Sequence, residues 1–183
     1  MVSDESLVNR AKQGDKEAWG EIYQAHVDRV YRYVASKVGR GMEAEDLSEQ
    51  VFIKAIQSLF NFKWQDKPIL AWLLSIAHNL VVDHWRKRAT QERFLASQNP
   101  TSSEAHEDDP ERLTERKLQM EDVRYSMSRL TPAQQEVISL RFAAELSLEE
   151  TGQAMKRSIG AVKALQHSAL AALRKALKED GRF

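Results

Sequence analysis

Side chains that could catalyse a reaction or hold a metal are scattered along this sequence and form no recognisable site. The chain has no cysteine, which excludes disulfides, thiol nucleophiles and thiolate metal ligands. None of its five histidines forms the i, i+4 pair, with an accompanying glutamate, that a helical zinc site requires. Neither a phosphate-binding glycine-rich loop nor a Gly-x-Ser-x-Gly turn is present. The sequence therefore predicts a protein without catalytic residues, metal or cofactor.

Side chains suited to nucleic acid gather instead on one predicted helix, which spans residue 69 to about residue 88. Asn79 and Asp83 lie one turn apart on it, and residues 84–88 add a histidine and three basic side chains. Asparagine can form paired hydrogen bonds to a base edge, and arginine binds phosphate. Basic residues also offset the dipole at the C-terminal end of a helix, so a purely structural explanation stays open.

The loop before this helix mixes aromatic and cationic side chains. Phe62, Lys63, Trp64 and Lys67 all lie within it. Stacking of an unpaired base on an aromatic ring is worth about 1–3 kcal/mol. Trp64 could provide such a ring, or it could equally cap the core of a helical bundle.

Two helix-capping motifs near the C-terminus frame a second candidate for DNA binding. Residues 131–134 place an N-cap, a proline at the first helical position and a glutamine three residues after the cap. Residues 147–150 repeat the capping pattern, and a long helix follows Ser158. A short helix (about 148–155), a tight break (about 156–158) and a long helix form the layout of a helix-turn-helix. Such hairpins also occur in purely structural bundles.

The elements that must position these side chains are all helical. Apolar residues recur every three or four positions over 19–34 and 47–59, with Asp15 at the N-cap of the first run, whereas alternating β-branched runs and Asn-Gly or Asp-Gly turns are absent. The side chains expected to hold this first bundle together are Trp19, Trp72, Leu73 and Trp85.

A stretch of different composition divides the chain. Residues 96–111 hold five acidic residues, two prolines and no Lys, Arg, Val, Ile, Leu, Met or aromatic residue. Such a segment cannot bury enough apolar surface to offset the entropy of ordering it. The sequence therefore predicts an all-α protein of two small helical domains, 1–95 and 118–183, joined by a flexible acidic linker over 96–117.

No membrane segment or secretion signal is predicted. The longest apolar run, 69–82, is 14 residues long and is interrupted by Ser75, His78 and Asn79, whereas a membrane span needs about 20 residues. Residues 1–10 lack the apolar core of a signal peptide. The composition, with 30% charged residues and equal numbers of basic and acidic ones, is that of a globular protein that we expect to be cytoplasmic.

Three stretches, read together, resemble a bacterial extracytoplasmic-function (ECF) sigma factor, the promoter-recognition subunit of RNA polymerase. Residues 45–55, EDLSEQVFIKA, are similar to the family pattern E-D-L-x-Q-E-x-F-x-K-A. Residues 68–86, PILAWLLSIAHNLVVDHWR, are similar to P-F-x-A-W-L-x-x-I-A-x-N-x-x-x-D-x-x-R. The third stretch runs from Leu130-Thr131-Pro132 to Lys163. In series, with the acidic linker between them, they are far more specific than any one alone.

The resemblance implies three binding surfaces and assigns residues to each. The residues expected to dock on the clamp of the largest core polymerase subunit are Asp46, Glu49, Gln50, Phe52 and Lys54. Those expected to bind the separated non-template strand of the −10 element are Lys63, Trp64, Lys67, Asn79, Asp83, His84, Arg86 and Arg88. Those expected to bind the −35 element, through a helix in the major groove, are Arg157, Ser158, Lys163, Gln166 and His167.

Further partners follow from the resemblance alone. Members of the family also contact the polymerase β subunit, are commonly held inactive by an anti-sigma factor, and thread their linker toward the polymerase active site. Plainer alternatives remain for two of these features. The 45–55 helix could present a merely solvated face over its apolar stripe, and the linker could be a simple solvating tether.

Two departures from the family pattern lie in the second domain. Lys156 occupies a turn position where the family often has glycine, and Leu165-Gln166 stands where Arg-Leu is common, with Ser168 in place of a second arginine. Leu165 would then face DNA and Gln166 the core, which predicts weak or atypical −35 binding that depends on the tethered first domain. The alternative function is a stand-alone helix-turn-helix regulator that binds duplex operators as a dimer.

Overall fold

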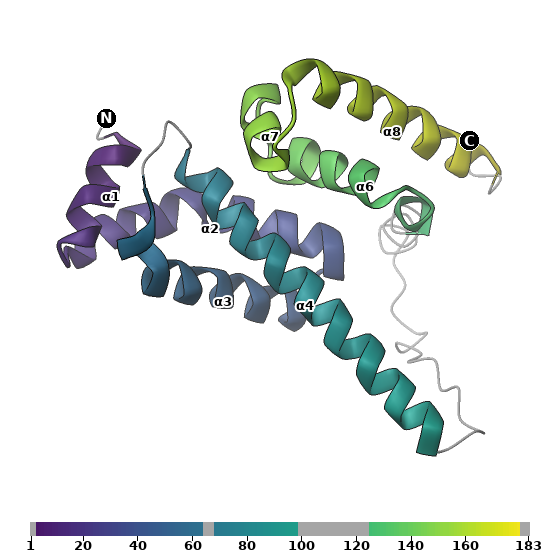
Figure 1. The fold of residues 1–183 in the computed structure, drawn as a ribbon, viewed down its shortest axis with the longest axis horizontal. Coiled ribbons are helices and arrows are strands. Elements are labelled where there is room, and N and C mark those ends of the chain that lie inside the picture. Colours follow the sequence, from purple (N-terminus) through teal and green to yellow (C-terminus); the bar gives the residue numbers. More distant parts are fainter. Residues whose placement is uncertain (1–2, 64–67, 99–124, 180–183) are drawn as a thin grey trace.

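The structure is a computed structural model that describes residues 3–63, 68–98 and 125–179. All regular elements in these ranges are helical, and no strand occurs among them. The predicted all-α class is therefore confirmed. The helices form a first lobe before residue 98 and a second lobe after residue 125, and Figure 1 shows the second lobe lying along one side of the first.

The first lobe is a bundle of four α-helices and one short 3-10 turn. Its elements are α1 (Asp4–Lys12), α2 (Lys16–Val38), α3 (Met42–Ser58), η1 (Leu59–Asn61) and α4 (Ile69–Gln98). Helix α2 is central, because it packs against α1, α3 and α4. Asp15 caps it as predicted, since its carboxylate accepts hydrogen bonds from the amides of Glu17 (3.0 Å) and Ala18 (3.1 Å).

Three of the four side chains expected to hold the first lobe together do pack in or against its core. Leu73 is fully buried, and Trp19 and Trp72 pack against the core with part of each ring exposed. Trp85 was predicted wrongly as a packing residue, because 41% of it is exposed. It lies beyond the point where α4 leaves the bundle, and its ring instead contacts His84 and the Arg88 guanidinium.

Helix α4 is longer than the periodicity suggested. The prediction ended it at about residue 88, whereas it continues to Gln98, past the expected domain boundary at 95. Among the described elements, those that pack against α4 are α2, α3 and α7. The apolar periodicity covers the part of α4 that packs in the bundle, so it ends before the helix does. Figure 1 shows the remaining part of α4 extending away from both lobes.

The described part of the second lobe begins with a helical segment at residues 125–128. Three further α-helices and one π-helical turn follow, namely α6 (Pro132–Ile138), η3 (Ser139–Ala143), α7 (Leu148–Met155) and α8 (Ile159–Glu179). Both predicted capping motifs are present. The side chains of Thr131 and Ser147 accept hydrogen bonds from the amides of Gln134 (3.3 Å) and Glu150 (3.1 Å), and each partner side chain bonds back to the amide of the cap.

The turn between α7 and α8 depends on a glycine that lies outside the turn itself. Lys156 ends α7 in the left-handed conformation, with φ of 54°, where glycine is the usual residue. One turn earlier, Gly152 lies against the chain after the break, and a Cβ there would stand 2.8 Å from the carbonyl oxygen of Arg157. The close approach that forms the turn therefore depends on Gly152.

The two lobes are packed together. Leu140, Ala144 and Leu146 of the second lobe are buried in the same apolar cluster as the core of the first. The contacts join η3 to α2 and α7 to α4. The prediction of two helical domains is confirmed, but their direct contact was not foreseen.

Candidate nucleic-acid and protein-binding surfaces

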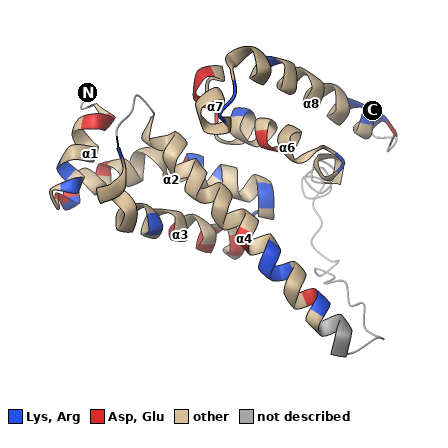
Figure 2. Ribbon diagram, in the orientation of Figure 1, with Lys and Arg blue, Asp and Glu red and all other residues tan. Residues whose placement is uncertain are grey.

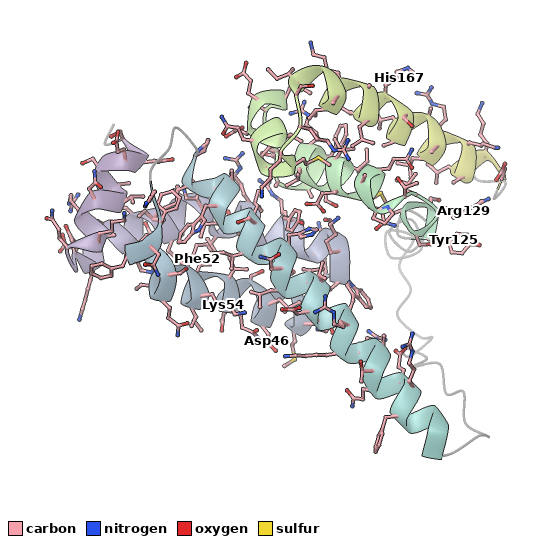
Figure 3. All side chains as sticks on the ribbon, viewed as in Figure 1. Asp46, Phe52, Lys54, Tyr125, Arg129 and His167 are labelled. Atoms are coloured by element: carbon pink, nitrogen blue, oxygen red, sulfur yellow. The ribbon has the colours of Figure 1, made fainter. Side chains whose placement is uncertain are left out.

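The outer face of α3 carries most of the residues predicted to bind polymerase. Asp46, Glu49, Gln50 and Lys54 are all exposed, and Figure 3 shows Asp46 and Lys54 on this helix. Three apolar side chains that the sequence reading did not single out are exposed beside them, namely Ile53, Ile56 and Phe60 (79% exposed). Acidic, basic and apolar groups therefore share one accessible face.

Phe52 does not belong to that face. It is 5% exposed and packs edge-on against the rings of Tyr23 (4.7 Å between centroids) and Trp19 (6.4 Å). Its assignment to polymerase binding is thus corrected, because a side chain inside the lobe offers no surface to a partner. The apolar contribution assigned to Phe52 is available instead from Ile53 and Ile56, which are exposed on the same helix.

The outer side of α4 is accessible, and it becomes basic where the helix leaves the bundle. Asn79, Asp83, Arg86 and Arg88 are exposed, and Figure 2 shows blue Lys and Arg segments where α4 leaves the bundle. Some of these groups are already paired within the chain. Arg86 contacts Asp83 (3.3 Å), and Arg88 contacts Glu92 (3.1 Å) and lies over the ring of Trp85 (5.5 Å).

His84 is positioned by the neighbouring helix. Its Nε2 lies 3.0 Å from the carboxylate of Glu43, so it joins α4 to the start of α3. The ring is partly exposed and touches Trp85 edge-on, with 5.5 Å between centroids. Asp83 and His84 therefore have partners within the chain, and both remain accessible in part.

A hollow between α3 and α4 brings two of the predicted surfaces together. It is lined by Lys54, Gln57, Ser58, Asn61, Ile76 and Asn79. Lys54 had been assigned to polymerase and Asn79 to DNA, and here they border one concave site. Gln57, Ser58 and Asn61 were missed, since no motif marks them and only the fold places η1 beside α4.

The loop between η1 and α4 is described in part. Phe62 is buried against Trp72, with 4.6 Å between ring centroids, so it supports the bundle and presents no ring to solvent. Lys63 is exposed. Trp64 and Lys67 lie outside the described residues, and their predicted role in binding a base stays a prediction.

The helix-turn-helix of the second lobe presents its basic residues outward. Arg157, Ser158, Lys163 and His167 are all exposed, and Figure 3 shows His167 on the side of α8 that faces away from the first lobe. The Ser158 hydroxyl accepts a hydrogen bond from the amide of Ala161 (3.2 Å). The exposed side chains that could contact a DNA backbone therefore lie at or near the start of α8.

The register of α8 differs from the prediction. Leu165 packs against the small core of the second lobe, in line with Val162 and Ala169, so it does not face DNA. Gln166 is partly buried, and its side-chain oxygen accepts a hydrogen bond from the Arg141 guanidinium (3.0 Å). The expectation that Leu165 faces DNA is therefore wrong, because the core stripe of α8 is set by its neighbours α6 and α7, whereas Gln166 is turned partly inward as expected.

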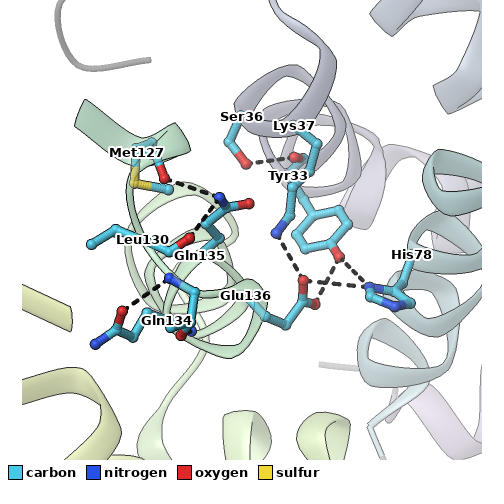
Figure 4. Close-up of polar contacts among 10 residues, drawn as sticks. Tyr33, Ser36, Lys37, His78, Met127, Leu130, Gln134, Gln135 and Glu136 are labelled. Carbon is cyan, nitrogen blue, oxygen red and sulfur yellow. Dashed lines mark hydrogen bonds and ion pairs between the residues drawn. The ribbon is translucent and has the colours of Figure 1, made fainter. Parts of the chain in front are cut away.

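A polar cluster that the sequence did not reveal joins the lobes. The Glu136 carboxylate on α6 lies 2.8 Å from the Lys37 ammonium and 3.4 Å from His78 Nδ1, and it accepts a hydrogen bond from the Tyr33 hydroxyl at 2.7 Å. Figure 4 shows these contacts, in which α2 and α4 of the first lobe surround one acidic side chain of the second. Local patterns could not predict it, because its members are far apart in sequence.

The electrostatics of this cluster favour a charged carboxylate. Burial alone would raise the pKa of Glu136, but His78, Lys37 and Tyr33 more than offset it and lower the pKa to about 2. The hydrogen bond that the His78 ring donates to the Glu136 carboxylate raises the pKa of His78 in turn, against a smaller opposing effect of burial. Glu136 is therefore ionised at neutral pH and attracts a proton to His78.

Comparison with known proteins identifies both lobes. Residues 22–91 match the family described as Sigma-70 region 2, and residues 126–175 match Sigma-70, region 4. The chain is 32% identical over 180 residues to the ECF RNA polymerase sigma factor ShbA of Streptomyces griseus, with 92% of each chain covered. The chain belongs to the ECF sigma factors of the sigma-70 family.

Other similar proteins support the same assignment of this ECF sigma factor. It is 35% identical over 176 residues to the ECF RNA polymerase sigma factor BldN of Streptomyces coelicolor, covering 96% of its own length and 66% of that relative. The solved structure of CnrH in complex with the cytosolic domain of CnrY matches its fold with a TM-score of 0.74 at 23% identity, covering 98% and 99% of the two chains. Nothing in these matches favours the alternative of a stand-alone regulator.

The region boundaries locate the surfaces within the sigma factor. The exposed face of α3, the hollow and the start of the basic part of α4 all fall within region 2, and the helix-turn-helix falls within region 4. Across the residues described, no helix is long and apolar enough to cross a membrane. The same residues contain no group of three or more His, Asp or Glu side chains arranged to hold a metal ion.

Proposed function

We propose that this sigma factor binds the clamp of the largest polymerase subunit through the outer face of α3. Asp46, Glu49 and Lys54 supply the charged rim, and Ile53 and Ile56 supply the apolar centre. Interfaces of this kind combine an apolar core with a polar rim. Phe52 acts indirectly, by holding α3 against α2 from inside the lobe.

The −10 element binds at the hollow between α3 and α4. Asn79 and Asn61 line it with amide groups that can form paired hydrogen bonds to a base edge. The exposed basic residues that follow on α4, Arg86 and Arg88, contact phosphates, which adds affinity but little sequence preference. A base removed from the duplex stack needs such a fitted site.

The −35 element binds at the start of α8. Arg157, Lys163 and His167 are exposed there, and the free amides of the first turn favour a phosphate. Gln166 is held by Arg141 inside the second lobe and contributes to position, not to base recognition. Weak −35 binding was expected because Leu165 would face DNA. That reason no longer holds, since Leu165 packs against the core of the second lobe.

The sigma factor itself catalyses nothing in this proposal and works in the cytoplasm, where polymerase performs the chemistry. Core polymerase, including its β subunit, and promoter DNA are its working partners. An anti-sigma factor is its proposed regulator. A protein that covered the exposed apolar groups of α3 would block polymerase, and CnrH was solved with a second protein bound.

The observation that carries the proposal is the presence, in one chain, of an accessible region 2 face and an accessible region 4 helix-turn-helix. The test is in vitro transcription with core polymerase and a library of promoter fragments. Asn79→Ala should change which −10 sequences are transcribed, whereas Arg88→Ala should weaken all promoters alike. A chain that fails to bind core polymerase, or that binds it and leaves every template closed, would contradict the proposal.

A further inference from the structure

Helix α1 lies against the turn that forms part of the hollow proposed for the −10 element. The region 2 match begins at residue 22, whereas α1 spans Asp4–Lys12, so this helix precedes the matched residues. It packs against α2 and against η1. The turn η1 ends at Asn61, which lines the hollow. A helix outside the region 2 match thus contacts one wall of this site.

Helix α1 is fixed to the bundle at both faces of its last turns. Leu7 and Val8 are buried in the core of the first lobe. The Arg10 guanidinium donates a hydrogen bond to the carboxylate of Asp15 (2.8 Å), the residue that also caps α2. Because α1 is held in this way, its last residue, Lys12, extends from a fixed position.

Lys12 reaches from α1 to the end of η1. Its ammonium donates a hydrogen bond to the carbonyl oxygen of Phe62 and lies over the Phe62 ring, 5.9 Å from the ring centroid. Hydrogen bonds from charged donors are stronger than those between neutral groups. One partly buried side chain therefore holds both the backbone and the ring of Phe62.

Phe62 connects the two walls of the hollow. It directly follows Asn61, and its amide donates a hydrogen bond to the Leu59 carbonyl oxygen (3.1 Å) at the end of η1. Its buried ring contacts Trp72 of α4, with 4.6 Å between centroids. Trp72 lies one turn before Ile76, which lines the hollow from the α4 side. A displacement of Phe62 would therefore affect both walls.

We propose that Lys12 is a positioning residue for the −10 site, which sets the place of Asn61 by fixing Phe62. This inference rests on the proposed function, in which Asn61 contacts a base of the separated strand. Lys12 is not among the residues that line the hollow, so it acts without touching DNA. Hydrogen bonds weaken steeply when their geometry is distorted, so a small displacement of Asn61 is enough to weaken its bond to a base.

The first test measures local opening at Phe62 in the full chain, without DNA or polymerase. Lys12→Met keeps an apolar stem and removes the ammonium. Hydrogen exchange of the Phe62 amide, followed by NMR, should accelerate at least about fivefold, because a charge-assisted hydrogen bond no longer fixes this residue. Lys16→Met, at an exposed position in the first turn of α2, is the matched control and should leave this rate unchanged.

Two comparisons separate positioning from a general loss of stability. Lys12→Arg keeps a cation that can donate to the carbonyl oxygen and lie over the ring, so it should restore the parent rate to within about twofold. The amide of Val51, fully buried in α3, reports opening of the whole lobe. Equal acceleration at Phe62 and Val51, or no acceleration at Phe62, would overturn the proposal.

The second test asks whether Lys12 acts through Asn61. Polymerase loaded with each variant is titrated with a promoter fragment that the parent transcribes, prepared with its −10 element unpaired. Lys12→Met and Asn61→Ala should each raise the Kd at least about fivefold, and the double variant should bind no more weakly than Asn61→Ala alone. Lys12→Arg should restore binding, and a duplex fragment that carries only the −35 element should bind all variants alike.

The outcomes separate the positioning role from the proposed function. Additive losses in the double variant would mean that Lys12 acts independently of Asn61, and the positioning role would be refuted. An Asn61→Ala variant that binds like the parent would instead contradict the proposed −10 site. The exchange measurement, which needs neither DNA nor polymerase, would still decide whether Lys12 fixes Phe62.

Discussion

The two lobes are stabilised in different ways. The first encloses an extensive core built from four α-helices, with Val30, Val51 and Leu73 fully buried. The second has a small core of its own, formed by Leu130, Val137, Ile138, Val162 and Ala169, and it buries three further apolar side chains only by packing on the first lobe. Small domains bury a smaller fraction of their surface, so the second lobe depends on its neighbour and on local capping.

This difference has a functional side. The first lobe, which has the large core, forms its two surfaces on α3 and α4 from its own residues. The second lobe, which has the small core, presents one, and its α6–η3 face is covered by the first lobe. The larger apolar core thus belongs to region 2, and the smaller one belongs to region 4.

The largest effect should come from the core of the first lobe. Leu73→Ala should lower the free energy of unfolding by about 2–5 kcal/mol, because it leaves a cavity at a fully buried site. All four tryptophans precede residue 98 in the sequence and none follows it, so their fluorescence reports on the first part of the chain, whereas far-ultraviolet circular dichroism reports on both lobes. Denaturant unfolding followed by the two signals should give coincident transitions for this variant.

Coincidence is expected because loss of the first lobe removes the cover from Leu140 and Leu146. Leu170→Ala, at a partly exposed position of α8, should change stability far less. A circular dichroism transition that persists after the fluorescence transition is complete would show that the second lobe stands alone.

The next effect should be confined to the second lobe. Gly152→Ala places a Cβ 2.8 Å from the Arg157 carbonyl oxygen, so α7 and α8 must shift apart. We expect a loss of about 1–3 kcal/mol, as for other overpacked sites. Circular dichroism should show an early transition while tryptophan fluorescence stays at its native value.

Gly160→Ala is the matched control for this substitution. A Cβ at Gly160 would have no neighbour within 4 Å, and alanine favours a helix over glycine by about 1 kcal/mol. The control should therefore be neutral or slightly stabilising. Equal destabilisation by both substitutions would refute the role assigned to Gly152.

These two lobes also show what sequence reading can and cannot reach. Asp15, Thr131 and Ser147 were identified as caps because a cap and its amide partners lie within three residues of one another. The family motifs identified the α3 face, the α4 helix and the helix-turn-helix for the same reason, since each lies within one continuous stretch.

Side-chain direction was harder, because it depends on elements distant in sequence. Phe52 was predicted to contact a partner, but it is buried. Trp85 was predicted to lie in the core, but it is partly exposed. Leu165 was expected to face DNA, but α6 and α7 set the register of α8. Glu136 could not be found at all, since its partners are Tyr33, Lys37 and His78, on two helices of the other lobe.

A smaller effect, of opposite sign, should come from the turn of the second lobe. Lys156 adopts the left-handed conformation, which costs a residue with a Cβ about 1–2 kcal/mol. Lys156→Gly relieves this cost but adds flexibility to the unfolded chain, so a net gain of about 0.5–1 kcal/mol is expected. The midpoint of the circular dichroism transition should rise, and the fluorescence midpoint should not. A fall in the circular dichroism midpoint would mean that the lysine stem contributes packing that outweighs its strain.

The smallest effect should be a pH dependence of the contact between the lobes. While the lobes are packed together, which we call closure, Glu136 of α6 raises the pKa of His78 above 6.5, whereas Lys37 of α2 opposes it and the neutral Tyr33 hydroxyl lies beside it. A raised pKa means that the contribution of His78 to closure is fully present below pH 6.5 and is lost as the pH rises through the higher value. Closure should therefore weaken between about pH 6 and pH 8. Since the imidazole is about half exposed, the change should not exceed about 1 kcal/mol.

His26 requires the comparison to be made by difference. Burial lowers its pKa, so its contribution has the opposite sign and is lost as the pH falls below 6.5. Energy transfer between dyes on Gln24→Cys and Ala171→Cys, at exposed positions of α2 and α8, should be recorded from pH 6 to pH 8 for this labelled parent and for His78→Gln in the same background. The effect of His26 cancels in the difference. The parent should open more than the variant as the pH rises. Parallel curves would mean that Glu136 holds the lobes together through Lys37 and Tyr33 alone, and the contact between the lobes would then be independent of pH in this range.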